Sequence, residues 1–169
     1  MKNKIIIING SGGCGKSTFV KLCNEIDSRV VELSTIDDIK TQSIKAEWWD
    51  GIKDDKGREL LCGMKDILTQ YGDIPFKKVV EEVNSLNNKI IFINSREPEE
   101  IHKFKQELNA ITLLIKNPNV PKITTNHADA NVECYNYDYT IVNDGSLDDL
   151  KSKGKVFLSN IKTNTKKEI

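Results

Sequence analysis

The side chains best suited to chemistry lie near the N-terminus, in residues 9–18 (NGSGGCGKST). From Gly10 to Ser17 they fit the pattern G-x-x-x-x-G-K-[ST]. In such a loop the glycines allow backbone N–H groups to surround an anion, the lysine reaches the β- and γ-phosphates, and the hydroxyl binds Mg²⁺. The pattern therefore predicts a nucleoside triphosphate site with ATP and Mg²⁺ as its ligands.

The segments on both sides of this loop have the pattern that a phosphate-binding loop needs. Residues 5–8 are isoleucines in a row, which predicts a buried parallel strand. Behind the loop, one helical face collects the apolar residues Phe19, Val20, Leu22, Cys23 and Ile26. A helix that begins there adds positive potential toward a phosphate. Strand, loop and helix agree, so a glycine-rich turn without a ligand is the weaker interpretation.

We expect the nucleotide to contact the whole loop, namely Gly10, Ser11, Gly12, Gly13, Cys14, Gly15, Lys16, Ser17 and Thr18. Lys16 is also the expected catalytic cation, and the hydroxyl of Ser17 is the expected metal ligand. Neighbouring N–H groups and Lys16 would favour a thiolate at Cys14. Phosphoryl transfer needs no chemistry from that thiol, so Cys14 has no expected catalytic role.

The composition argues against several classes of protein. The 169 residues suffice for one domain with a sizeable core. Lys and Arg number 25 and Asp and Glu number 25, so no global field favours nucleic acid or an anionic membrane. No apolar run is long enough to span a bilayer, and the chain does not open on a signal-peptide pattern. The cysteines form no C-x-x-C pair, which argues against zinc and disulfides. We therefore expect a cytoplasmic, reduced protein.

Strand and helix patterns alternate along the chain. Beyond 5–8, strands are expected at 29–33 (RVVEL), 89–94 (KIIFIN), 110–115 (AITLLI) and 137–142 (YDYTIV). Helical spacing fills most of the segments between them. This alternation predicts a three-layer α/β/α fold of the P-loop NTPase type with a five-stranded parallel sheet. We assign residues 1–161 to a single domain and 162–169, which are polar and lysine-rich, to a disordered tail.

Two segments interrupt the alternation. Residues 34–88 contain helices and no strand, and we expect them to form a helical insertion that binds a second substrate. Its polar part, 50–57, is expected to be a loop, and the next helix is expected to bury Leu60, Leu61, Met64, Leu68 and Tyr71. Trp48 and Trp49 are expected to cover the core of the insertion. Residues 116–136 have weak periodicity and are expected to form a lid with Lys116, Lys122 and His127.

Other classes of P-loop domain need residues that this chain lacks. A GTPase reads guanine with N-K-x-D, which does not occur here. A motor ATPase usually ends an apolar strand on a carboxylate, whereas the third strand ends at Asn94-Ser95-Arg96. A small kinase needs an ATP cradle, a second-substrate site and a lid that excludes water. Such lids often carry arginines, but 116–136 contains none. The organisation of the chain favours a small kinase.

Several segments carry a resemblance to a known family: the loop 10–17, LSTIDDIK at 33–40, KGRELL at 56–61, NSREPEEI at 94–101 and NDGSLDDL at 143–150. Their order is similar to that in P-loop kinases of the nucleoside monophosphate kinase type. More narrowly, the chain resembles the deoxynucleoside monophosphate kinase superfamily, which includes phage-type enzymes and animal-type phosphomevalonate kinases. The resemblance covers most of the chain.

The resemblance implies further site residues. Asp37, Lys40, Arg58 and Arg96 would bind the acceptor, and Arg96 would also act in catalysis. Asp144 and Gly145 would lie beside the adenine of ATP. Position also supports Arg96, because open α/β sheets bind ligands at the carboxyl ends of their strands. Other roles remain open: an ion pair with Asp54 or Asp55 for Arg58, and an ion pair with Glu99 or Glu100 for Arg96. Lys40 could equally be an exposed surface residue, and Asp37 could cap its helix.

The expected function is transfer of the γ-phosphoryl group of ATP to a phosphorylated small molecule, with a nucleoside or deoxynucleoside monophosphate as the first choice. Two alternatives stay open: a small kinase for another phosphorylated metabolite, and a nucleotide-binding regulatory module without catalysis. The expected partner is the small-molecule phosphate acceptor, not nucleic acid or a membrane. The chain would act as a monomer or a homodimer.

Overall fold

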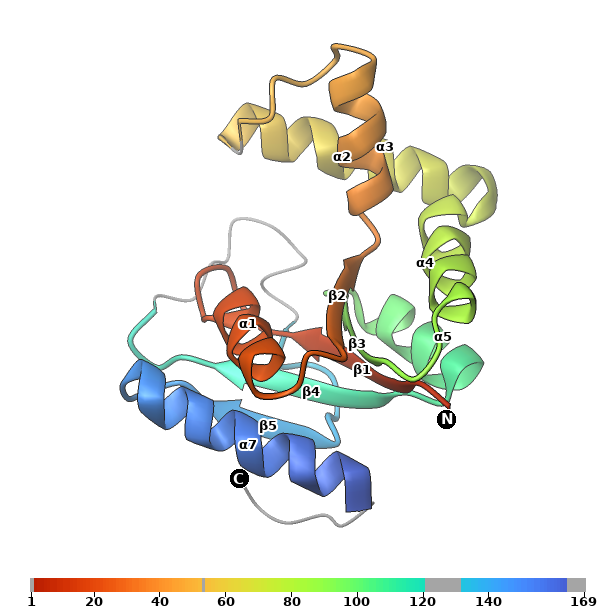
Figure 1. Cartoon of the computed structure of the whole chain (residues 1–169). Coiled ribbons are helices and arrows are strands. Elements are labelled where there is room, and N and C mark those ends of the chain that lie inside the picture. The colour runs from red at the N-terminus through yellow and green to blue at the C-terminus, as the bar shows by residue number, and fades with distance from the viewer. Residues whose placement is uncertain (1, 53, 121–131, 164–169) are drawn as a thin grey trace. The chain divides into compact units, whose positions relative to one another are not determined.

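The five predicted strands form one sheet. The computed structural model describes residues 2–52, 54–120 and 132–163. Its strands are β1 (Lys4–Asn9), β2 (Val30–Ser34), β3 (Ile90–Asn94), β4 (Ile111–Lys116) and β5 (Tyr139–Val142). They lie in the order β2-β3-β1-β4-β5, and β1 pairs in parallel with both β3 and β4, as β4 does with β5 (Figure 1). The prediction of a five-stranded parallel sheet is confirmed.

Helices cover both faces of this sheet. The helices of the described residues are α1 (Lys16–Ile26), α2 (Asp37–Lys45), α3 (Asp55–Gly72), α4 (Ile74–Ser85), α5 (Pro98–Leu108) and α7 (Leu147–Thr163). Those that cover the sheet are α1, α5 and α7, whereas α2, α3 and α4 belong to the separate unit 33–86. Ile6 and Ile8 of β1 pack in one cluster with residues of α1 and α7, and these two helices contact each other. Ile7 is also fully buried, and it faces the opposite side because strand residues alternate. There α5 contacts β1 and β4, which completes the three layers (Figure 1).

Aromatic side chains fix α1 and α7 against the sheet. Phe19, Phe92 and Phe157 are fully buried, and their ring centroids lie 6.0 to 6.2 Å apart. Tyr139 meets Phe157 edge to face at 5.3 Å. Each such ring buries about 150–250 Å² and prefers these tilted contacts, so the cluster is a large source of stability. It holds the start of α1, where the phosphate-binding loop ends, in a defined position on the sheet.

The chain divides into two compact units. The first consists of Met1–Glu32 and Asn87–Ile169, and the second of Leu33–Leu86, which corresponds to the expected insertion at 34–88. The second unit has a small core of its own, in which Ile39, Trp49 and Leu61 are buried. Within the described ranges, no helix combines the length and the apolar character needed to cross a bilayer.

The start of α3 differs from the prediction. Gly57, expected in a loop, lies in the first turn of the helix because α3 begins at Asp55. The side chain of Asp54 accepts a hydrogen bond from the backbone N–H of Gly57 at 2.7 Å, and this is an N-cap. Two of the expected core residues of α3 are exposed instead, Leu60 at 38% and Tyr71 at 84%.

Three further expectations change in detail. Trp49 is buried, and its indole N–H donates to the carbonyl of Ile52 at 2.9 Å, whereas Trp48 is 66% exposed and does not cover the core. α7 continues to Thr163, so the first two residues of the expected tail at 162–169 are helical. Lys116, expected in a lid, is the last residue of β4. Lys122 and His127 of that lid lie outside the described residues.

Candidate functional site

The loop that joins β1 to α1 can be formed only by glycine at two of its positions. Gly10 has a φ of 151°, and a Cβ there would lie 2.5 Å from the carbonyl oxygen of Ile115. Gly15 has a φ of 100°, and a Cβ there would lie 2.5 Å from the side-chain nitrogen of Asn143. Both the dihedral angle and the space exclude a larger residue. The glycines of the motif therefore permit close packing of the loop against the ends of β4 and β5.

Lys16 folds back over the loop. Its ammonium group donates to the carbonyl of Gly10 and, at 3.0 Å, to the carbonyl of Ser11. This arrangement places a positive charge within the loop, at the N-terminus of α1. Cys14, by contrast, is only 2% exposed and belongs to the core beneath the loop. Its thiol is therefore shielded, although the sulfur lies 3.9 Å from the Lys16 nitrogen.

Ser17 lies beside a carboxylate that the sequence analysis did not single out. The hydroxyl of Ser17 is 3.5 Å from a carboxylate oxygen of Glu32, and the same oxygen accepts a hydrogen bond from the side-chain amide of Asn94 at 2.6 Å. The three residues come from α1, β2 and β3. Glu32 is the charged residue of β2 (VVELS) and lies near the carboxyl end of that strand, and this was the available signal.

These side chains fit a hard divalent cation. Carboxylate, hydroxyl and amide oxygens are the protein ligands that Mg²⁺ prefers, and Mg²⁺ at nucleotide sites takes few protein ligands because phosphates and waters supply the others. The described part of the chain contains no group of three or more His, Cys, Asp and Glu side chains that could hold a metal ion.

A buried polar network connects the start of the loop to the turn that carries Arg96. Asn9 is fully buried at the end of β1, and its side-chain oxygen accepts the N–H of Gly10 at 2.7 Å. Its amide nitrogen donates to the carbonyl of Arg96 at 3.2 Å and to the hydroxyl of Tyr137 at 2.7 Å. That hydroxyl donates to the carbonyl of Val132 at 2.8 Å, and burial raises the pKa of Tyr137 to about 12. The network fixes the backbone of Arg96 relative to the loop and leaves its side chain exposed.

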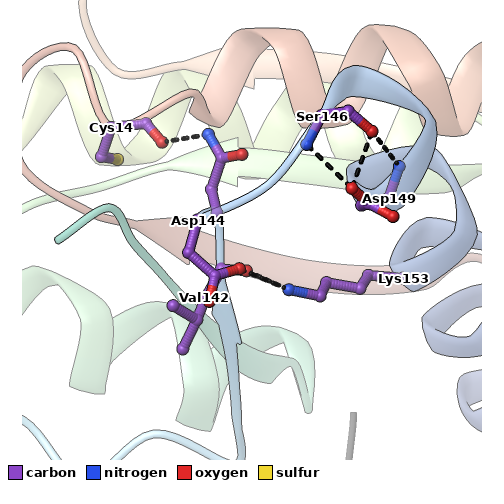
Figure 2. A network of polar contacts seen from close by, with 7 residues as sticks. Cys14, Val142, Asp144, Ser146, Asp149 and Lys153 are labelled. Atoms are coloured by element: carbon purple, nitrogen blue, oxygen red, sulfur yellow. Dashed lines mark hydrogen bonds and ion pairs between the residues drawn. The ribbon is translucent and has the colours of Figure 1, made fainter. Parts of the chain in front are cut away.

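The segment between β5 and α7 lies beside the phosphate-binding loop. The side-chain amide of Asn143 donates to the carbonyl of Cys14 at 3.0 Å, and this hydrogen bond is the dashed line at Cys14 in Figure 2. Three residues on, a reciprocal pair caps α7: Asp149 accepts from the backbone N–H and the hydroxyl of Ser146 at 2.9 and 2.7 Å, and the N–H of Asp149 donates to that hydroxyl at 3.2 Å. Asp144 and Gly145, expected near the adenine, are thus held between two anchored points.

Asp144 has a further partner. A carboxylate oxygen of Asp144 lies 3.0 Å from the ammonium group of Lys153, which also donates to the carbonyl of Val142 at 2.6 Å (Figure 2). The hydrogen bond from Lys153 holds the pKa of Asp144 below its usual value. The carboxylate is therefore ionised and engaged by a lysine of α7.

The expected acceptor residues fall in both units. Arg96 belongs to the first unit, whereas Asp37, Lys40 and Arg58 belong to the second. Within the second unit, Lys40 pairs with Asp37 at 2.9 Å, and Arg58 is exposed in the first turn of α3. A shallow, open groove of about 420 Å³ runs along the same helix and is lined by Lys56, Glu59, Leu60, Gly63, Met64 and Ile67.

Comparison with protein sequences gives relatives without an assigned activity. No family model matches the chain. UPF0200 proteins from Saccharolobus solfataricus and from Saccharolobus islandicus strain L.S.2.15 are each 30% identical to it over 122 residues. The alignment covers 71% of this chain, and the chain spans only 60% of the length of these relatives.

Comparison with solved structures identifies the fold. The TT1252 protein from Thermus thermophilus is 18% identical, with a TM-score of 0.57 over 95% of this chain and 98% of that one. A shikimate kinase from Acinetobacter baumannii is 17% identical, with a TM-score of 0.52 over 99% and 96%. A sugar kinase from Janibacter sp. HTCC2649 is 14% identical, with a TM-score of 0.53 over 98% and 99%. The chain has the α/β fold of small P-loop kinases.

Proposed function

We propose that the protein is an ATP-dependent phosphotransferase that moves the γ-phosphoryl group of ATP to a small molecule. The observation that carries this proposal is the loop from Gly10 to Ser17 at the carboxyl end of β1. Its backbone conformation requires glycine at Gly10 and Gly15, and it presents Lys16 and Ser17 at the start of α1. Strand, loop and helix together form the arrangement in which backbone N–H groups bind a triphosphate.

Catalysis in this proposal consists of positioning and charge neutralisation. Little covalent chemistry is left to the protein in phosphoryl transfer. Lys16 would leave the loop carbonyls and bind the transferring phosphoryl group, and Ser17 would be the metal ligand of the loop. Bound Mg²⁺ would neutralise charge on the phosphates. Arg96 would clamp the acceptor with its planar guanidinium, which can bind two oxygens at once.

A nucleoside or deoxynucleoside monophosphate is the acceptor that we favour. A phosphorylated acceptor needs cationic side chains, and Lys40, Arg58 and Arg96 are the candidates. The sequence resemblance to deoxynucleoside monophosphate kinases supports the same class. Asp37 already pairs with Lys40 at 2.9 Å, so an acceptor phosphate would compete with Asp37 for that lysine.

A second candidate is a kinase for another small metabolite. The similar structures include a shikimate kinase and a sugar kinase, whose names state acceptors that are not nucleotides. A third reading, a nucleotide-binding module without catalysis, would keep the loop and lack transfer. We also retain as proposals a cytoplasmic location and a monomeric or homodimeric state.

One screen separates these readings. ATP consumption and product formation are measured with Mg²⁺ against nucleoside and deoxynucleoside monophosphates, shikimate, simple sugars and phosphorylated metabolites, with a reaction that lacks any acceptor. We expect turnover with at least one monophosphate above the control. Turnover only with a sugar or another metabolite would replace the acceptor and keep the reaction. Nucleotide binding without transfer to any acceptor would favour the regulatory module.

A further inference from the structure

The carboxylate of Glu32 is held in a defined place beside the phosphate-binding loop. One of its oxygens accepts the side-chain N–H of Asn94 at 2.6 Å and lies 3.5 Å from the hydroxyl oxygen of Ser17. Glu32 is exposed, and β2 and β3, which carry Glu32 and Asn94, are neighbours in the sheet. All three residues belong to the first unit.

The position of this charge is unfavourable for a nucleotide alone. A triphosphate in the loop is strongly anionic, and the hydroxyl of Ser17 faces the metal and phosphate side of such a site. A carboxylate this close to that hydroxyl would repel the phosphates, because like charges a few ångströms apart interact strongly near a protein surface. A divalent cation between the two reverses the sign of the interaction. The contact is therefore favourable only when nucleotide and cation bind together.

We infer that Glu32 is the protein carboxylate of the divalent-cation site and that Asn94 is the positioning residue that orients it. The inference rests on the proposed binding of ATP. The chain carries an amide at the tip of β3 and the carboxylate on the adjacent strand β2, and the hydrogen bond of 2.6 Å joins the two. Oxygen ligands from Glu32 and Ser17, with the nucleotide phosphates and water, supply the coordination that Mg²⁺ prefers.

Manganese binding tests the assignment without relying on activity. Mn²⁺ is titrated into the full chain with a saturating, non-hydrolysable ATP analogue, and free Mn²⁺ is followed by electron paramagnetic resonance. We expect Glu32→Gln to weaken Mn²⁺ binding by about 10- to 100-fold, the range observed when groups that support a metal site are removed. Glu107→Gln removes an exposed glutamate from α5 and is the matched control; its affinity should equal that of the wild type.

A second measurement tests nucleotide binding without metal, where Glu32→Gln should raise the affinity instead of lowering it. In excess chelator, Glu32→Gln should bind the metal-free analogue more tightly than the wild type, because the repulsion between the carboxylate and the phosphates is gone. A general loss of structure would weaken both kinds of binding. Ligand-free thermal unfolding of each variant shows whether the fold is kept, and Glu32→Asp, which retains the charge on a shorter side chain, replaces the Gln variant if that variant does not fold.

Variants of Asn94 provide an independent test of the assignment in the same Mn²⁺ titration. Asn94→Ala should weaken Mn²⁺ binding by less than Glu32→Gln, about tenfold, because the carboxylate remains but loses its orientation. The double variant Glu32→Gln with Asn94→Asp moves the charge from β2 to β3, and it should recover part of the affinity. Mn²⁺ affinity of Glu32→Gln within about twofold of the wild type would overturn the assignment while leaving ATP binding intact. Failure of the wild type to bind the analogue with either Mg²⁺ or Mn²⁺ would overturn the proposed function as well.

Discussion

The phosphate-binding end of the first unit and the helical second unit differ in how tightly their parts are fixed. Around the loop, Asn9 at the end of β1 donates to the carbonyl of Arg96, and Asn143 after β5 donates to the carbonyl of Cys14. Tyr137 completes the buried network around Asn9. Gly10 and Gly15 have no room for a side chain. This end of the molecule is held in one conformation by hydrogen bonds and close packing.

The second unit is built with a smaller core and more exposed apolar surface. One buried cluster of its described residues joins Ile39, Trp49 and Leu61, with Ile36, Met64 and Leu68 packed against it. Its exposed large apolar residues include Ile44, Trp48, Ile52, Leu60, Ile67 and Tyr71. The first unit exposes few residues of this kind among those described, namely Val142, Leu147 and Val156.

Under the proposed function, the two units would have different roles. A preorganised site suits the nucleotide, because stabilisation of developing charge depends on groups already in place. Substitutions in the first unit should therefore have larger effects on phosphoryl transfer and on stability than substitutions in the second.

Removal of the loop cation should produce the largest effect. Lys16→Ala is expected to lower the rate of phosphoryl transfer on the order of 10³-fold, because the charge that would bind the transferring group is lost. The ammonium group of Lys16 bonds to the carbonyls of Gly10 and Ser11 and lies 3.9 Å from the sulfur of Cys14, so its removal takes away little packing and the melting temperature should change little. Lys21→Ala, at an exposed position of α1, is the control for removal of a lysine. Wild-type turnover in Lys16→Ala would remove Lys16 from the mechanism.

Arg96 should be the next most sensitive position. Arg96→Lys keeps the charge and loses the bidentate geometry, so transfer should fall on the order of 10²-fold. The carbonyl of Arg96, held by Asn9, is unaffected by this substitution. Steady-state kinetics with the best acceptor measures the loss, and Arg29→Lys, whose partner is Asp27, serves as control. Catalytic efficiency within about twofold of wild type would make Arg96 a structural residue.

Substitution of one glycine in each unit by alanine compares the packing of the two units directly. Gly10→Ala should destabilise the protein by about 2–3 kcal/mol, because it combines an unfavourable φ with a Cβ placed 2.5 Å from the Ile115 carbonyl oxygen and from the Cys14 sulfur. Gly51 in the second unit also has a positive φ, 87°, but a Cβ there meets nothing within 4 Å. Gly51→Ala should therefore cost only about 1 kcal/mol, the penalty of the dihedral angle. Urea unfolding gives both values, and equal losses would show that packing at the loop adds nothing.

The buried phenol of Tyr137 should have a smaller effect that depends on pH. Tyr137→Phe removes hydrogen bonds to Asn9 and Val132 and should cost about 1–2 kcal/mol near neutral pH. Tyr71→Phe, at a position 84% exposed in the second unit, should cost almost nothing.

The direction of the pH effect follows from the pKa of Tyr137. Burial raises this pKa to about 12 in the folded protein, whereas a tyrosine in an unfolded chain ionises near pH 10. Between these values only the unfolded state loses the proton, so the stabilisation from Tyr137 is complete below pH 10 and declines as the pH rises toward 12. The stability difference between the wild type and Tyr137→Phe should thus shrink from about pH 9 to about pH 11. A difference that stays constant over this range would show that the phenol does not titrate as described.

Local patterns predicted most of the first unit. The isoleucine run, the glycine motif and the helical face after it are contiguous, so β1, the loop and α1 followed from spacing alone. The contacts that complete the site join distant residues: Asn9 and Tyr137 are 128 positions apart, and Glu32 and Asn94 are 62 apart. Such pairs depend on which strands become neighbours, and a strand order of β2-β3-β1-β4-β5 is not encoded in any one segment.

The second unit was predicted less well because its local signals are ambiguous. Gly57 has the low helix propensity of a loop residue, but the N-cap from Asp54 places it inside α3. Leu60 and Tyr71 match the helical period of the core face and are nevertheless exposed, since this small unit buries few residues. Periodicity identifies one apolar stripe and does not show how much of the stripe another element covers.

Gly63 provides the smallest and most specific test of this difference. It lies in the interior of α3, is exposed, and has no atom within 4 Å of where a Cβ would be. Alanine loses less backbone entropy than glycine in a helix, so Gly63→Ala should stabilise the protein by about 0.5–1 kcal/mol in urea unfolding. Gly57→Ala in the same helix is the contrasting variant, because its Cβ would collide with the carbonyl oxygen of Ile52, and it should destabilise the protein. Gly63 also lines the open groove of α3, so a higher KM for the acceptor with unchanged KM for ATP would place the acceptor in that groove. Destabilisation by Gly63→Ala would contradict the open surface described for this unit, because a methyl group on an uncovered helix face has nothing to collide with.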